Sequence, residues 1–192
     1  MPIQLASGCK ALAAIVVPQS PTEQEQYAAN ELCSYLSLMT SAAFDVVQAP
    51  YDGVQIAIGR AAEVFAAPDP GLGEDGFCIE TGAYGAAIRG GKRGAIYGVY
   101  ELLERLGCRF FTPTCEKIPS ETELMLPELH TRQVPALEYR DHGYCDFVQN
   151  GRFAVKSRLN GHFPQIKEKH GGHMSYTGYV HTLGNIVPVE VW

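Results

Sequence analysis

The sequence has no apolar run approaching the roughly 20 residues that a helix needs to span a bilayer. It also lacks an excess of basic residues, because 15 Lys and Arg face 21 Asp and Glu among its 192 residues, a formal net charge of −6. Phosphate backbones are bound by clustered Lys and Arg, so this balance argues against nucleic-acid binding. We therefore expect neither a membrane nor a nucleic acid as a partner.

Several cofactor motifs are missing as well. None of the six cysteines forms a C-x-x-C pair, which leaves a zinc-ribbon or thioredoxin interpretation without support. The segment GGKRG at 90–94 matches neither G-x-x-x-x-G-K-[ST] nor G-x-G-x-x-G. Its glycines indicate a tight turn and close helix–sheet packing, with anion binding at a helix N-terminus as the less favoured alternative. We predict no cofactor.

A metal-binding motif is also absent. His170, His173 and His181 could supply three imidazoles to a zinc ion. Their spacing differs from H-E-x-x-H, and the glycines at 171 and 172 favour a loop over a helix. We expect loop histidines and no metal site.

The cysteines and the N-terminus bear on the compartment. Cys33 and Cys108 lie in apolar patterns, where a free thiol behaves as a small hydrophobic side chain. Only Lys10 precedes the short apolar run at the start, which predicts a first strand and not a signal peptide. The cytoplasm is then the default location, and an extracytoplasmic one stays open for a longer parent protein. An unrelated enzyme using Cys115 or Cys145 would need a nearby base and a lowered thiol pKa, and the sequence shows neither.

Charge is unevenly distributed along the chain. Residues 142–192 carry five basic and three acidic side chains, which leaves ten basic and eighteen acidic residues before them. The front is therefore −8 and the tail +2, and five of the six histidines lie in the tail. Hydrophobic periodicity also weakens there. We place a domain boundary at residues 134/135, with one domain at 1–134 and the start of another at 135–192.

The pattern of the front predicts alternating strands and helices. Apolar runs at 13–17, 44–47 and 54–58 are typical of short strands. Residues 22–39 have apolar residues at three- and four-residue spacing, which indicates a helix, and Ser20 or Thr22 can cap it. A short helix is expected at 61–65 and a loop at 68–76.

Residues 77–80 and 86–89 predict a hairpin, and residues 93–106 a second helix that Gly107 ends. Further strands are expected at 108–111 and 124–126. The front is thus predicted to be an α/β (α+β) layer, a small mixed sheet of about five to seven strands with two main helices on one face.

Residues 12–141 resemble the small α/β domain that precedes the barrel in alpha-glucuronidases and beta-hexosaminidases. The resemblance is greatest to large, little-characterised bacterial proteins that carry this domain before a glycoside hydrolase-like barrel. The matching segments are YAANELCSYLSLMT at 27–40, IAIG at 56–59, DGFCI at 75–79, IRGG at 88–91, RGAIYGVYELLE at 93–104 and LGCRFFTP at 106–113.

The resemblance continues beyond residue 134. PALEYRD at 135–141 is similar to the first barrel strand of those proteins. SRLNG at 157–161 and the segments at 171–172 and 181–182 resemble the part of the barrel that comes after that strand. A (β/α)₈ barrel takes about 250 residues, so 135–192 would be its truncated start, and the paired carboxylates of a glycosidase would lie on later strands.

The resemblance therefore implies a non-catalytic accessory domain of a glycoside hydrolase-like protein. Its partner would be the catalytic barrel, and its contact with a carbohydrate substrate indirect. The parent protein would be a glycoside hydrolase, and this chain alone inactive. The alternative is a free-standing module that binds a glycan or a protein.

Arg140 and Asp141 lie at the C-terminal end of the predicted barrel strand, the end that faces the active site in barrels. Arginine suits a carboxylate, such as that of a uronic acid. With Asn160 and His181, these residues are the candidates for substrate binding in a complete protein. The alternative is an ordinary ion pair of Arg140 with Glu138 or Asp141. We predict no catalytic residue within the chain.

Aromatic residues near the second helix could form a sugar-stacking platform. Their helical spacing and strand setting instead predict packing in the core. These residues are Tyr97, Tyr100, Phe110 and Phe111.

Overall fold

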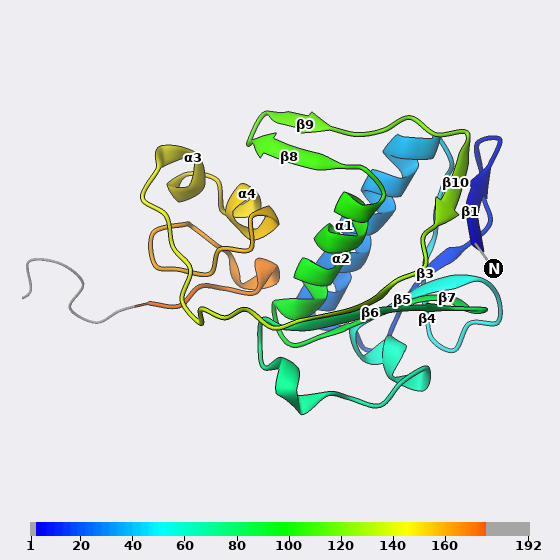
Figure 1. The fold of residues 1–192 in the computed structure, drawn as a ribbon, viewed down its shortest axis with the longest axis horizontal. Coiled ribbons are helices and arrows are strands. Elements are labelled where there is room, and N and C mark those ends of the chain that lie inside the picture. The colour runs from blue at the N-terminus through cyan, green and yellow to red at the C-terminus, as the bar shows by residue number, and fades with distance from the viewer. Residues whose placement is uncertain (1–2, 176–192) are drawn as a thin grey trace, which may run out of the picture.

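The computed structural model describes residues 3–175, and it has a mixed sheet of six strands with two long helices on one face (Figure 1). The strands are β1 (Ile3–Ser7), β2 (Lys10–Ala11), β3 (Ala14–Val17), β4 (Val46–Gln48), β5 (Gln55–Ile58), β6 (Phe77–Gly82), β7 (Gly85–Gly90), β8 (Arg109–Thr112), β9 (Cys115–Lys117), β10 (Glu123–Leu126) and β11 (His130–Gln133). The α-helices are α1 (Glu23–Thr40), α2 (Gly94–Arg105), α3 (Cys145–Val148) and α4 (Gly151–Lys156), and the 3₁₀-helices are η1 (Gly59–Val64), η2 (Pro70–Leu72) and η3 (Glu168–His170).

The main sheet has the strand order β11-β6-β7-β5-β3-β4. Strands β4, β3, β5 and β7 are parallel, whereas β6 runs antiparallel to both β7 and β11. All residues of β3 and β5 are buried, which explains their continuous apolar sequences, since strands covered on both faces need not alternate. The predicted mixed sheet with two main helices on one face is confirmed.

Helix α1 begins where its sequence predicts. The Thr22 side chain accepts a hydrogen bond from the Glu25 backbone N–H, and the Glu25 carboxylate accepts one from the Thr22 backbone N–H. This capping box satisfies two backbone donors at the helix start. Glu25 also pairs with Arg60 at 2.8 Å, which ties the helix to the end of β5. The hydrogen bonds from Arg60 and Thr22 outweigh burial and lower the pKa of Glu25.

The glycines around the start of α2 allow close packing of the backbone. A Cβ atom on Gly94 would lie 1.9 Å from the Gly76 carbonyl oxygen, and one on Gly91 would lie 2.0 Å from that of Gly73. Neither space admits a side chain. The geometry therefore supports the packing interpretation of this segment. Gly107 has a φ of +100° just after the helix, in agreement with its predicted role as terminator.

The sheet face opposite α1 and α2 carries a smaller apolar layer. Small residues there pack under η1, and the Phe65 and Tyr84 rings stack with centroids 3.8 Å apart. The buried residues of this layer are Val16, Ala57, Ala61, Ala62 and Ala87.

Two small sheets flank the main one, with strand orders β10-β1-β2 and β8-β9. The strand predicted at 108–111 is present as β8, but it pairs only with β9 and so does not extend the main sheet. As side chains alternate along a strand, Phe110 faces Tyr35 and Tyr100, whereas Phe111 is 59% exposed. The prediction that Phe111 packs in the core is therefore wrong.

Residues 135–141 form no strand in the described structure, contrary to the expected barrel strand. A strand needs a ladder of backbone hydrogen bonds. The Arg140 carbonyl oxygen accepts one from the Asn160 N–H at 3.0 Å, but among residues 3–175 no strand pairs with this segment. The chain instead continues into α3 and α4. Helix α4 packs through Ala154 and Val155 on the same core as α1 and α2. Among residues 3–175, no helix has both the length and the apolar character needed to cross a membrane.

Candidate functional site

The surface between the α/β layer and residues 135–175 is built from opposite charges. Basic side chains of the later segment contact acidic side chains of the earlier one at several points, and Lys92 and Glu168 form one pair of the reverse polarity. The charge asymmetry of the sequence is therefore charge complementarity across an internal interface. The pairs are Arg140–Asp75, Arg152–Glu31, Lys156–Glu116, Arg158–Glu101 and Arg158–Glu104.

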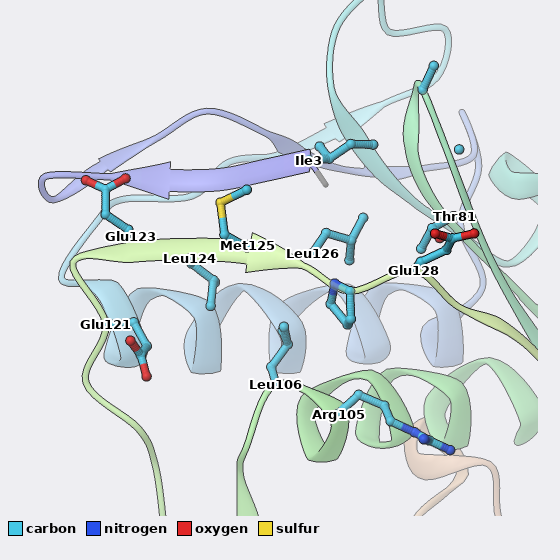
Figure 2. Close-up of a pocket in the computed structure, with 13 residues that line it drawn as sticks. Ile3, Thr81, Arg105, Leu106, Glu121, Glu123, Leu124, Met125, Leu126 and Glu128 are labelled. Atoms are coloured by element: carbon cyan, nitrogen blue, oxygen red, sulfur yellow. The ribbon is translucent and has the colours of Figure 1, made fainter. Parts of the chain in front are cut away.

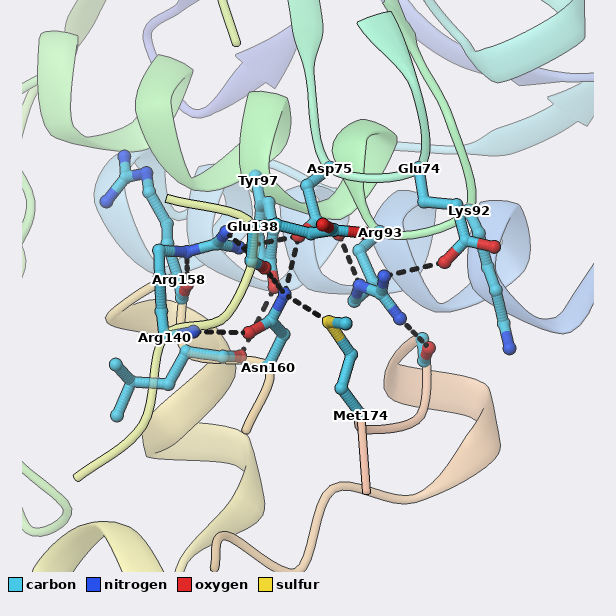
Figure 3. A network of polar contacts seen from close by, with 12 residues as sticks. Glu74, Asp75, Lys92, Arg93, Tyr97, Glu138, Arg140, Arg158, Asn160 and Met174 are labelled. Atoms are coloured by element: carbon cyan, nitrogen blue, oxygen red, sulfur yellow. Dashed lines mark hydrogen bonds and ion pairs between the residues drawn. The ribbon is translucent and has the colours of Figure 1, made fainter. Parts of the chain in front are cut away.

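Asp75 lies at the centre of one polar network in this interface (Figure 3). Its Oδ2 atom accepts hydrogen bonds from Arg140 Nη2 at 2.8 Å and from Asn160 Nδ2 at 2.7 Å. Its Oδ1 atom pairs with Arg93 Nε. The side chain is 12% exposed, so one largely buried acid holds two arginines and an amide from three separate parts of the chain.

Arg93 connects this network to the start of α2. Its side chain is 6% exposed, and it also contacts Glu74 at 2.6 Å and the Gly171 carbonyl oxygen at 3.2 Å. Burial disfavours the charged guanidinium, but the hydrogen bond and the charge of Asp75 outweigh it, so the pKa of Arg93 is raised. Arg93 therefore remains a cation within the interface.

The structure brings Arg140 and Asn160 together, as their shared assignment to one site implies. Asn160 is fully buried, and its side-chain oxygen accepts a hydrogen bond from the Arg140 backbone N–H at 2.8 Å. The ion-pair alternative named the wrong partners for Arg140: its guanidinium pairs with Asp75 and meets Glu138 only through a backbone carbonyl.

Asp141 lies outside this network. Its carboxylate accepts hydrogen bonds from the Tyr139 hydroxyl at 2.5 Å and from the His142 backbone N–H at 2.8 Å. Burial raises the pKa of Asp141, but these hydrogen bonds more than offset it, so the pKa is lowered overall. His181 lies outside the described residues. Substrate binding by Arg140, Asp141 and Asn160 stays a prediction.

A cavity of about 250 Å³ borders the Asp75 network. Charged groups of both signs line it, together with Met174, whose sulfur lies 3.6 Å from Asn160 Nδ2. The cavity could hold a small polar group, but four of its charged side chains, Glu74, Asp75, Arg93 and Arg140, are already paired with one another. The charged lining residues are Glu74, Asp75, Arg93, Glu138 and Arg140.

Lys156 forms the second main contact of the interface. Its ammonium group pairs with Glu116, donates to the Tyr35 hydroxyl at 2.6 Å and lies 4.8 Å from the Phe110 ring centroid. The side chain is only 4% exposed. Burial lowers the pKa of Lys156 more than Glu116 raises it.

A third cluster places Glu31 between a tyrosine and an arginine. Its Oε2 atom accepts from the Tyr100 hydroxyl at 2.6 Å, and its carboxylate pairs with Arg152 at 2.9 Å. The Tyr100 and Tyr27 hydroxyls are 3.1 Å apart. Burial raises the pKa of Tyr27 to about 12 and that of Tyr100 well above 10, so both phenols remain protonated at neutral pH.

Of the histidines in the sequence-based metal hypothesis, His170 and His173 lie against different groups, and His181 lies outside the described residues. His170 packs against the Tyr27 ring with centroids 4.4 Å apart, whereas the His173 ring lies nearest the Ile166 carbonyl oxygen and the His162 ring. Within residues 3–175, no group of three or more His, Cys, Asp or Glu is placed to hold a metal ion.

His170 should make the stability of the interface sensitive to acid. Burial, and then Lys169, lower the pKa of His170 below 6.5, while Glu31 opposes this effect. Folding therefore favours the neutral ring, so the stability is present above about pH 6.5 and lost as the pH falls. Other groups near the ring are Tyr27, Lys167 and Arg152.

We expect the free energy of unfolding of His170→Gln to fall less steeply between pH 7 and pH 5 than that of the wild type. Urea denaturation at several pH values measures this slope. His130→Gln is the matched control, because it makes the same substitution at a side chain that is 69% exposed. Equal slopes for His170→Gln and the wild type would contradict the prediction.

Sequence reasoning missed Asp75, Lys156 and Glu116 as members of this site. Asp75 carried a signal, since it opens the DGFCI segment on which the resemblance rests. Lys156 and Glu116 carried none, because a charged residue in a polar segment looks like an ordinary surface residue until its partner is known.

Neither a protein-family model nor a curated protein matches the sequence. Solved structures do match in fold. A family GH115 4-O-methyl-alpha-glucuronidase with specificity for decorated arabinogalactans aligns with a TM-score of 0.61 at 16% identity, covering 92% of this chain and 30% of that one. A mutant Streptomyces plicatus beta-hexosaminidase in complex with its product GlcNAc aligns with a TM-score of 0.54 at 17% identity, covering 83% and 30%.

The chain therefore shares its fold with part of these two enzymes, and it spans about 30% of the length of each. The likeness to the glucuronidase extends past the predicted boundary, because 92% coverage exceeds the 134 of 192 residues that precede it. At these identities the likeness concerns the fold alone.

Proposed function

We propose that the chain is a non-catalytic accessory domain of a glycoside hydrolase-like protein, related to alpha-glucuronidases and beta-hexosaminidases. The observation that carries this proposal is the fold shared with two such enzymes over most of this chain but less than a third of theirs. A domain of this kind would pack against a catalytic barrel and stabilise it. The catalytic carboxylates would then come from that barrel.

The charged interface supports this role. Residues 135–175 contact the α/β layer through largely buried ion pairs at Asp75 and Glu116. If the barrel begins at residue 135, as we propose, these contacts hold its first segment in place. Substrate contact by Arg140, Asp141, Asn160 and His181 belongs to the same proposal and applies to the complete protein. To bind substrate in the complete protein, the Arg140 guanidinium would have to leave its ion pair with Asp75 and pair with a group of the substrate.

Incubation of this chain with aryl glycosides and aryl glucuronides tests the proposal. We expect no release of the aryl group above that in buffer, because two suitably spaced catalytic carboxylates are required and are assigned to the barrel. Turnover that is lost on Asp141→Asn, in a variant that remains folded by circular dichroism, would contradict the accessory role. Asp52→Asn, at an exposed position in a loop, is the control substitution.

A binding module is the second candidate, favoured by a groove of about 920 Å³ beside β10. Titration calorimetry against a panel of oligosaccharides separates the two for glycans. The accessory role predicts no heat of binding, whereas saturable binding would favour the module.

A further inference from the structure

Strand β10 leaves one of its edges unpaired. It ends the small sheet of order β10-β1-β2, and among residues 3–175 no strand pairs with its second edge. All four of its residues line the groove of about 920 Å³ (Figure 2). In this view β10 runs between β1 above and the side chains of Arg105 and Leu106 below. The groove therefore follows the strand.

The pairing with β1 shows where the free backbone groups of β10 point. The Gly8 N–H donates to the Thr122 carbonyl oxygen at 2.9 Å, and the same register pairs Ser7 with Glu123. Hydrogen-bonded and non-hydrogen-bonded pairs alternate in antiparallel sheets, so the N–H and C=O of Glu123 point away from β1. The irregularity in register adds a residue to β1 and none to β10. Along β10, backbone groups that point toward β1 therefore still alternate with those that point away, and the N–H and C=O of Met125 also point away from β1.

The side chains of β10 fit it to accept a further strand. Leu124 and Leu126 are buried in the core and fix the strand in place. Glu123 and Met125 face solvent, and Met125 is 42% exposed. Ile3 and Leu106 add apolar surface to the groove. An added strand would thus find both backbone partners and apolar contacts.

The groove has an excess of negative charge. Glu121, Glu123 and Glu128 line it, and all three are exposed. Glu123 receives hydrogen bonds from the neutral Gln4 and Ser7 side chains. Among the lining residues that the structure describes, Arg105 is the one cation, and it pairs with Glu101 at 2.9 Å. The open carboxylates therefore favour a cationic partner.

We propose that β10 binds an extended, basic peptide segment of a partner protein, which adds to its free edge as a strand. Backbone hydrogen bonds supply the binding, and alternate side chains supply the selectivity. Lysine or arginine at every second position would lie on the same face as Glu123 and Met125, where their charges meet the glutamates of the groove, and the apolar residues between them would lie on the other face, toward Leu106. A second copy of β10 is disfavoured because its glutamates would meet like charges. This docking does not depend on the accessory role.

A designed peptide tests the docking. The probe is a fluorescein-labelled heptapeptide of alternating Lys and Val, titrated with the 192-residue chain and followed by fluorescence anisotropy. A peptide of alternating Glu and Val controls for charge. A third peptide has the Lys and Val sequence with alternate backbone amides N-methylated, so that it keeps its charge but cannot form one row of hydrogen bonds. We expect saturable binding of the first peptide only, with at least about a tenfold loss for the others.

Two charge variants localise the binding. Glu121→Lys with Glu128→Lys should weaken the binding of the first peptide at least about tenfold, because the groove loses its negative charge. Asp52→Lys with Glu63→Lys makes the same change in net charge at exposed positions that do not line the groove and should alter binding less than about twofold. Circular dichroism checks that both variants fold.

Three results would overturn the docking. They are no binding of the Lys and Val peptide, equal binding of its N-methylated form, and equal effects of the two double variants. Equal binding of the N-methylated peptide would mean that charge alone causes the binding. Equal effects of the two double variants would mean that the peptide binds the negative charge of the protein in general and not the groove beside β10. Slower amide hydrogen exchange at Glu123 and Met125 on addition of the first peptide would support the docking.

Discussion

Asp75→Ala is expected to lower the free energy of unfolding by about 3 kcal/mol, near the lower end of the range for breaking a buried ion pair. The substitution leaves Arg140, which is 16% exposed, without a carboxylate partner, so that backbone carbonyl oxygens and the face of the Tyr97 ring are left to it. Asn160 loses an acceptor in a fully buried position. Arg93 keeps Glu74, so the loss falls mainly on the contacts that hold the later segment.

Urea denaturation measures the loss, and limited trypsin digestion locates it. Cleavage after Arg152 and Arg158 should accelerate more than cleavage after Lys10, because the interface opens while β1 stays in its sheet. Asp75→Asn keeps the volume and removes the charge, so it should show most of the same loss. Asp69→Ala is the control: Asp69 pairs with Arg132, which is 53% exposed, and water can take its place.

Equal losses for the Asp75 and Asp69 variants would show that the buried network contributes no more than a surface pair. The interface would then depend on the apolar packing of α4. The proposal that the Asp75 ion pair holds the first segment of the barrel in place would have to be abandoned.

Glu116→Leu is also expected to destabilise the protein by about 3 kcal/mol, because it leaves the Lys156 charge buried without a carboxylate. Lys156→Met should cost less, since Glu116 is 22% exposed and can be solvated by water while it keeps the Tyr35 hydroxyl as donor. The double variant should come close to the wild type, because apolar residues of similar volume often replace a buried pair without loss.

A double-mutant cycle at neutral pH measures this coupling. The double variant should be more stable than Glu116→Leu alone, although it carries one substitution more. Additive losses in the cycle would mean that the two side chains do not act as a pair. Arg105→Met with Glu101→Leu is a less suitable control because Glu101 also holds Arg158. Arg132→Met with Asp69→Leu tests an exposed pair and should show little coupling.

Local sequence was sufficient to predict most elements of the front. Apolar runs located β3 and β5, helical spacing located α1 and α2, and Thr22 and Gly107 marked helix ends. These features depend on neighbours within a few residues, so their signals lie in the sequence. Strand β11 was missed because HTRQ is polar and joins the sheet only through β6.

Which charges pair, and which surface stays open, could be learned only from the folded chain. Asp75 and Asn160 are 85 residues apart, and Lys156 and Tyr35 are 121 apart, so no local pattern connects them. The uneven charge of the two segments was visible in the sequence and was interpreted as a domain boundary, but only the tertiary structure shows that the opposite charges face one another. The reason is physical: backbone conformation follows from near neighbours, whereas an ion pair or a free strand edge depends on how distant segments are brought together.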